Sequence, residues 1–76
     1  ASILVAISAN DEIWIDKRRI DPRSIRAVIG RIHAQNPQGS VIIQADKQST
    51  NDKLVKVMDA AREAGVYDIA ISIRKE

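Results

Sequence analysis

Cysteine is absent from the 76-residue chain. This excludes a disulfide framework and a zinc site built on thiolates, and it leaves the cellular compartment open, because periplasmic and cytosolic proteins can both do without disulfides. A chain of this length has room for one hydrophobic core, which supplies only a few kcal/mol of net stability. We therefore expect residues 1–76 to form a single domain that gains stability by dimerisation.

Long hydrophobic runs are also missing. No apolar stretch approaches the roughly 18 residues that predict a transmembrane helix, and the first residues alternate instead of forming the hydrophobic core of a signal peptide. We therefore expect the fragment to be soluble. It begins with Ala1 and not with methionine, which is consistent with a piece of a longer protein whose membrane anchor would lie outside it.

Aromatic residues are scarce, since Trp14 and Tyr67 are the only two. The formal net charge is +2, but basic residues are concentrated in one segment, where Asp21 is the only acid. They are Lys17, Arg18, Arg19, Arg23, Arg26 and Arg31. A nucleic-acid interface would interleave such a patch with stacking aromatics, so we expect no nucleic-acid partner and interpret the patch first as solvated charge.

The first half of the chain predicts a hairpin followed by a helix. The segment SILVAISA has the two-residue period of a strand, and IWID follows it after a short polar turn. Asp21 can cap the helix, which should end near Gln35, because Asn36 precedes a proline and is disfavoured from the helical region. One helix face carries Ile25, Val28, Ile29 and Ile32.

The second half predicts a strand, a helix and another strand. SVIIQA is a short β-branched run, and YDIAISI alternates like a strand near the end of the chain. Between them, Ser49 with Asp52 fits a capping box, and Thr50 is an alternative cap. Gly65 should close the helix, because glycine adopts the left-handed conformation without penalty. The buried side of the helix carries Leu54, Val57, Met58 and Ala61.

The predicted fold is α+β, a small two-layer domain of order β-β-α-β-α-β with a mixed sheet and two helices on one face. The last strand-helix-strand unit should be a right-handed parallel crossover. The sheet face under the helices is expected to carry Ile3, Val5, Ile7, Ile13, Ile15, Ile69, Ile71 and Ile73. The opposite face is mildly apolar and is a candidate surface for a dimer or a partner. It carries Leu4, Trp14, Ala70 and Ser72.

Residues that could support catalysis are few. His33 is the sole histidine, has no evident nucleophile beside it, and cannot hold zinc alone, so we interpret it as a boundary residue near a helix end. Asp46 follows a parallel strand, where many α/β enzymes place acid-base groups, but bracing the loop is the simpler role. The loop ADKQSTND has no glycine for cradling phosphate. We predict no enzyme, no cofactor and no metal site. Trp14 either packs under a loop or anchors an interface.

The stretches QADK and LVKVMDAAREAG, followed by an apolar strand, resemble the periplasmic domain of the ExbD/TolR family. The resemblance spans nearly the whole fragment and is strongest over residues 41–73; DEIWID resembles the family's short second strand. General similarity in the second helix and last strand favours ExbD over TolR. Many relatives carry an aromatic near the start of that helix, where this chain has Thr50, Asn51 and Asp52, so a contact made by that aromatic does not carry over.

The resemblance implies a non-enzymatic subunit of an ion-driven inner-membrane motor of the ExbB-ExbD-TonB type. Its transmembrane helix, with the ion-coupling aspartate, would lie outside this fragment and contact an ExbB-like subunit. The domain would sit at the periplasmic face of the inner membrane, form a homodimer, and bind a TonB segment, and peptidoglycan as a further partner, to transmit proton-motive energy for nutrient import across the outer membrane. The alternative is a TolR domain that binds peptidoglycan or TolA in envelope maintenance.

Two surfaces are the candidate sites. An extended partner segment, or a second copy of the chain, should add a strand beside Ile69, Ala70, Ile71, Ser72 and Ile73. The competing interpretation is that these isoleucines belong to the core. Wall carboxylates should meet a basic surface formed by Arg18, Arg19, Arg23, Arg26 and Arg31.

Overall fold

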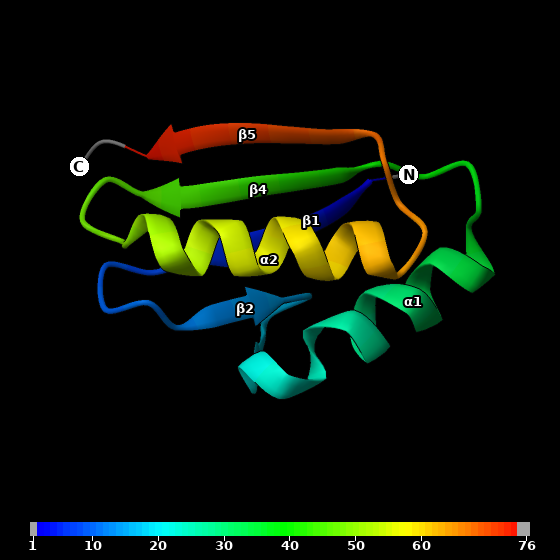
Figure 1. Ribbon diagram of the computed structural model, residues 1–76, viewed down its shortest axis with the longest axis horizontal. Helices are drawn as coiled ribbons and strands as arrows, with labels where there is room; N and C mark the ends of the chain where they lie inside the picture. The colour runs from blue at the N-terminus through cyan, green and yellow to red at the C-terminus, as the bar shows by residue number, and fades with distance from the viewer. Residues whose placement is uncertain (1, 75–76) are drawn as a thin grey trace.

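A computed structural model describes residues 2–74 and shows a mixed five-stranded sheet with both helices on one face (Figure 1). The strand order across the sheet is β3-β2-β1-β4-β5. β4 runs parallel to both of its neighbours, whereas β2 is antiparallel to β1 and to β3. The predicted α+β class and one-sided arrangement of helices are confirmed. The elements are β1 (Ile3–Ile7), β2 (Ile13–Ile15), β3 (Arg18–Ile20), the 3-10 helix η1 (Pro22–Ser24), α1 (Ile25–Gln35), β4 (Val41–Asp46), α2 (Asn51–Glu63) and β5 (Ile69–Arg74).

β3 is one strand more than the sequence predicts. It forms a hairpin with β2, in which Trp14 lies opposite Arg19 and Ile15 lies opposite Arg18. The two-residue turn consists of Asp16 and Lys17, whose φ angles are 54° and 65°. Two-residue turns with positive φ angles usually contain a glycine, which makes them recognisable in a sequence. This one has none, and the adjacent arginines are not typical strand formers, so local pattern offered little signal for β3.

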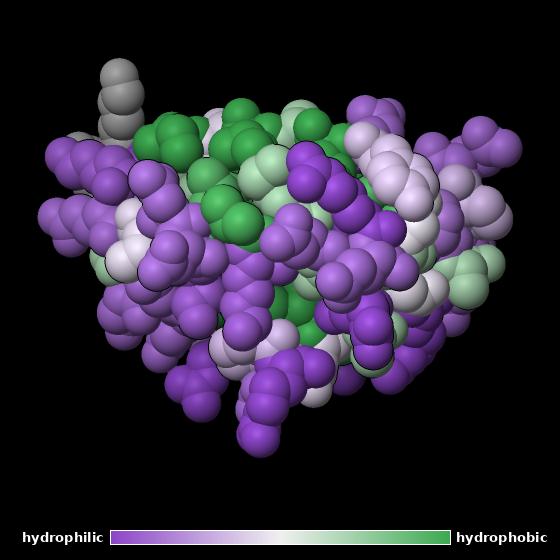
Figure 2. Space-filling view, in the orientation of Figure 1, coloured by the Kyte–Doolittle hydropathy of each residue, from purple (hydrophilic) through white to green (hydrophobic). Residues whose placement is uncertain are grey.

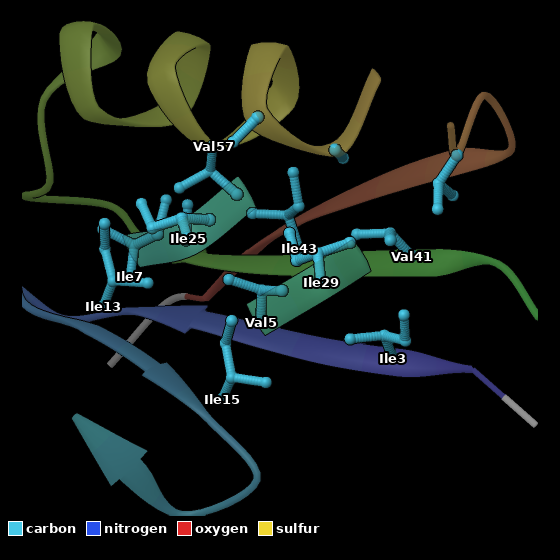
Figure 3. Close-up of a cluster of buried hydrophobic side chains, with 14 residues drawn as sticks. Ile3, Val5, Ile7, Ile13, Ile15, Ile25, Ile29, Val41, Ile43 and Val57 are labelled. Atoms are coloured by element: carbon cyan, nitrogen blue, oxygen red, sulfur yellow. The ribbon is translucent and has the colours of Figure 1, made fainter. Parts of the chain in front are cut away.

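The hydrophobic core lies between the sheet and the two helices. Figure 3 shows side chains of β1, β2 and β4 pointing toward Ile25 and Ile29 of α1 and Val57 of α2. These three helical residues are fully buried. The alternation in β1 and β2 is as predicted, and β4, predicted to be buried on at least one face, also has every second residue buried. No polar or charged residue is buried among those that the structure describes, so apolar burial dominates the cohesion of this small core.

The start of α2 is held by a contact between distant parts of the chain. Thr50 is the N-cap, and its hydroxyl accepts a hydrogen bond from the N–H of Lys53 at 3.2 Å. The alternative cap is therefore the one observed, because the Ser49 hydroxyl donates to the C=O of Asp46. The carboxylate of Asp11 accepts from the N–H and the hydroxyl of Thr50 at 2.8 and 2.9 Å. Asp11 thus joins the β1–β2 turn to α2.

The ends of both helices follow their local sequence. Asp21 caps η1, where its carboxylate accepts from the N–H of Arg23 at 2.8 Å, and α1 continues from there to Gln35 as predicted. Gly65 follows α2 with a φ of 96°, which is the left-handed conformation expected of it. His33 packs against Gly65, since its Nε2 would lie 3.7 Å from a Cβ added there.

Candidate partner-binding edge of the sheet

The residues predicted to receive a partner segment lie on β5, the edge strand that pairs with β4 in the sheet formed by residues 2–74. β5 is the most exposed strand of the sheet, since Ile69 alone is partly buried and the rest of the strand is exposed. Ile71 is 43% and Ile73 is 51% exposed. The interpretation of these two isoleucines as core residues is therefore wrong, and an apolar edge strand faces solvent.

The register explains why these isoleucines are exposed although they lie on the helix-covered face. Ile71 pairs with Ile43 and Ile73 with Ala45, so each shares a sheet face with a buried residue of β4. Figure 1 shows α2 in front of β1 and alongside β4, with β5 on the far side of β4 from both helices. Figure 2 shows hydrophobic surface gathered along this edge. Val55 of α2, 52% exposed, adds an apolar side chain from the helix layer.

Two hydrogen bonds at the ends of the β4–β5 ladder show which main-chain groups of β5 are already used. The N–H of Val41 donates to the C=O of Asp68 at 2.9 Å, and the N–H of Lys47 donates to the C=O of Arg74 at 3.1 Å. Successive residues of a strand direct these groups to opposite edges, so the even-numbered residues of β5 face β4. The N–H and C=O groups at the open edge therefore belong to Ile69, Ile71 and Ile73.

The predicted basic surface is less uniform than its sequence indicates. Arg19 lies 3.3 Å from Glu12, Arg23 lies 3.1 Å from Asp21, and Arg26 lies 3.9 Å from Glu63. The hydrogen bond from the Arg23 side chain is the main reason that the pKa of Asp21 falls to about 2. Within residues 2–74, no carboxylate pairs with the two remaining arginines. These are Arg18 and Arg31.

Asp46 and His33, the two residues considered for catalysis, lie at the end of β4 and near the end of α1. The Asp46 carboxylate accepts from the N–H of Gln48 at 2.9 Å, and its C=O accepts from the N–H of Ser49 at 2.9 Å. Asp46 therefore braces the β4–α2 loop, as its simpler interpretation predicts. The buried Nδ1 of His33 has no hydrogen-bond partner in the described part of the chain. Over the same residues, no cluster of three or more His, Asp or Glu side chains is arranged to hold a metal ion.

Sequence reasoning missed the exposure of Val55 and the contact between Asp11 and Thr50. Val55 lies outside the predicted buried stripe of α2, and an apolar residue on the polar side of a helix was the only available signal. Asp11 gave no signal, because its partner Thr50 lies 39 positions away.

No helix in residues 2–74 has the length and hydrophobicity needed to cross a membrane.

Two comparisons with known proteins point to the same family and cover nearly the whole chain. The family model described as "Biopolymer transport protein ExbD/TolR" matches residues 1–76. A relative named "Biopolymer transport protein exbD2", from Vibrio cholerae serotype O1 (strain ATCC 39315 / El Tor Inaba N16961), is 44% identical over 75 residues. The match covers 99% of this chain but 56% of the relative, so the chain spans little more than half the length of that protein.

Proposed function

The chain belongs to the ExbD/TolR family of biopolymer transport proteins, and we propose that it is the periplasmic coupling domain of an ion-driven inner-membrane motor of the ExbB-ExbD-TonB type. In this proposal an extended TonB segment pairs with β5 and so receives the motor's state. The family's role in transport agrees with the prediction of a non-enzymatic domain. The exposed, apolar open edge of β5 is the observation that carries the proposal.

The edge is suited to an extended segment because main-chain pairing supplies affinity for almost any sequence, while alternate side chains supply selectivity. Ile71 offers an N–H and a C=O to such a segment. On the helix side, the segment's side chains would cover Ile71, Ile73 and Val55, removing apolar surface from water. An aromatic contact from the start of α2 does not contribute, since Thr50, Asn51 and Asp52 occupy that place.

The same edge supports a homodimer. Two copies of β5 can pair across a two-fold axis, since such an interface uses the same surface on both subunits. Self-pairing and partner binding would then compete for Ile69, Ile71 and Ile73. The transmembrane helix that would contact an ExbB-like subunit lies outside this sequence in our proposal.

A TolR-type role is the second candidate, in which the domain binds TolA or peptidoglycan. The exposed Arg18 and Arg31 support it, because neither has a carboxylate partner among the described residues. The ion pairs of Arg19, Arg23 and Arg26 weaken it, since those charges already have local partners. The 44% identity to a protein named exbD2 also favours the ExbD-type role.

The test is a titration of isotope-labelled protein with a TonB-derived peptide, a TolA-derived peptide and purified peptidoglycan, followed by amide chemical shifts. We expect the TonB peptide to produce the largest shifts over Ile69–Ile73. Ile71→Pro removes the N–H at the open edge and should weaken this binding by about tenfold or more. Ile71→Lys, which keeps that N–H and adds an edge charge, should weaken binding less.

Two results would count against the proposal. Shifts centred on Arg23, Arg26 and Arg31, with Ile69–Ile73 unmoved, would show that the β5 edge is not the binding site. Binding of peptidoglycan or of the TolA peptide, with none of the TonB peptide, would favour the TolR-type role.

A further inference from the structure

A second surface lies at the start of β1, on the flank of that strand that faces β2 and away from β5. It is a hollow of about 600 Å³ between the first residues of β1, the end of the β2–β3 hairpin and the C-terminal end of α1. Leu4, Trp14 and Ile32 contribute apolar walls, and Lys17 and Gln35 lie at its margin. Leu4 is 49% and Trp14 is 38% exposed. We call this hollow the β1 notch.

The notch exists because the β2–β3 hairpin is too short to cover β1. Pairing between β1 and β2 ends where Val5 lies opposite Ile15, and the chain reverses directly afterwards. The N–H of Ile3 donates to the C=O of Ser40 at 2.7 Å, on the β4 side. Because main-chain groups alternate along a strand, the N–H of Leu4 points to the β2 side, just past the last pair between β1 and β2, where Asp16 begins the turn into β3. An extended segment can therefore continue the sheet at this point.

The rim of the notch is basic. Arg31 lies one turn before Gln35 on α1, and i, i+4 residues share a helix face. Arg18 lies opposite Ile15, which lines the notch, and therefore points to the same face of the sheet. These two are the arginines without a carboxylate partner in the described chain. Together with Lys17 they outweigh Asp16, the one acidic residue of the lining.

We propose that the β1 notch binds a short extended peptide segment of a partner protein, in which apolar side chains alternate with carboxylates. The N–H of Leu4 would pair with the segment's main chain. Its apolar side chains would lie on the open face of the sheet, against Leu4 and Trp14, and its carboxylates would lie on the helix side, near Arg18 and Arg31. A glycan would use the basic rim but not the combination of a strand edge and apolar walls. This site is separate from the β5 edge and does not depend on the function proposed for that edge.

The probe is a capped eight-residue peptide that alternates valine and glutamate, and its control replaces each glutamate with lysine. Trp14 is the sole tryptophan, so its fluorescence reports on the notch directly. The valine-glutamate peptide should shift the Trp14 emission to the blue and move the amides of Leu4 and Ile32. Binding should weaken as salt is raised, because the rim charges are exposed. The lysine peptide should leave Trp14 unchanged.

Arg31→Glu and Arg26→Glu form a matched pair on the same helix. Arg31→Glu should weaken binding of the valine-glutamate peptide by about fivefold, the scale of one exposed charge contact. Arg26→Glu makes the same charge change away from the notch and should have less than a twofold effect, although it also removes the pairing with Glu63. Amide spectra of both variants verify that the domain remains folded.

The proposal is overturned if the valine-glutamate peptide shifts only β5, if both peptides bind equally, or if neither binds at millimolar concentration. Equal losses in Arg31→Glu and Arg26→Glu would also overturn it. A soluble muropeptide is the third ligand. If it moves Trp14 and Leu4 while the peptide does not, the notch is a glycan site and the proposal is wrong.

Discussion

The two edges of the sheet differ in nearly every property that controls strand pairing. β3 has three residues, two of which are exposed arginines, and a tight turn precedes it. β5 has six residues, with Ile71 and Ile73 exposed. Natural sheets usually discourage pairing at their edges with short strands and charge. β3 follows that rule and β5 does not, so the difference identifies the edge that is left able to pair.

The two edges also differ in how they are attached to the rest of the sheet. On the β3 side, a short hairpin with a strained turn is attached to the core through β2. On the β5 side, a long strand is secured to β4 by a parallel ladder, and its far side is open. Changes on the two sides should therefore have different consequences for folding and for binding.

The sharpest test of the β5 edge compares two adjacent prolines. Ser72→Pro removes an N–H on the β4 side and should lower the free energy of unfolding by about 2–3 kcal/mol, since a ladder bond is lost and the ring disturbs the strand. Ile71→Pro removes an N–H on the open side and should cost less than about 1 kcal/mol. Urea denaturation measures both. Equal losses would mean that the assignment of inward and outward groups in β5 is wrong.

Asp11 connects the β3 side of the molecule to α2, and removing it should loosen that connection. Asp11→Ala loses both hydrogen bonds to Thr50 and leaves an alanine at a φ of 66°. We expect a loss of about 2 kcal/mol in the free energy of unfolding. Asp11→Asn keeps an oxygen acceptor and tolerates the left-handed backbone, so about 1 kcal/mol is expected. If alanine and asparagine cost the same, the contact with Thr50 contributes little.

The turn before β3 offers a stabilising change. Lys17 has a φ of 65°, which is unfavourable for a residue with a Cβ. Lys17→Gly should raise the free energy of unfolding by about 0.5–1 kcal/mol, because relief of strain exceeds the added flexibility of the unfolded chain. Lys47→Gly is the control in a loop without positive φ, and it should not stabilise. Thermal unfolding distinguishes the two variants. A destabilised Lys17→Gly variant would contradict the claim that the backbone at Lys17 is strained.

The smallest effect concerns Asp21, which lies just after β3. Its pKa is lowered from 3.8 to about 2, mainly by the hydrogen bond from the Arg23 side chain. A carboxylate with a lowered folded pKa contributes stability above pH 4, and this contribution disappears as the pH falls through about 2. Carboxyl carbon shifts should show this titration, and Arg23→Ala should return the pKa toward 3.8. A titration of Asp21 that is unchanged by Arg23→Ala would contradict the assigned cause.

Much of the fold was predictable because its signals are local. Alternation in β1 and β2 and the apolar stripes of α1 and α2 arise from repeats of two and 3.6 residues, which a short segment displays by itself. The family resemblance rested on such segments and is confirmed. β3 was missed because Asp16 and Lys17 form its turn without a glycine. The strand predicted to receive a partner, β5, is an exposed edge strand, but the sequence did not predict the exposure of Ile71 and Ile73 or the ion pairs of the arginines.

The sequence alone determined which side chains share a face, where the helices end, and the family to which the chain belongs. Only the tertiary structure decided that Ile71 and Ile73 are exposed, that their main-chain groups face outward, and that Arg18 and Arg31 differ from the other arginines. The physical reason is the distance along the chain over which each effect acts. Backbone periodicity acts over a few residues, whereas exposure depends on where α2 lies over the sheet, and the pairing of Arg26 depends on Glu63, which lies on the other helix.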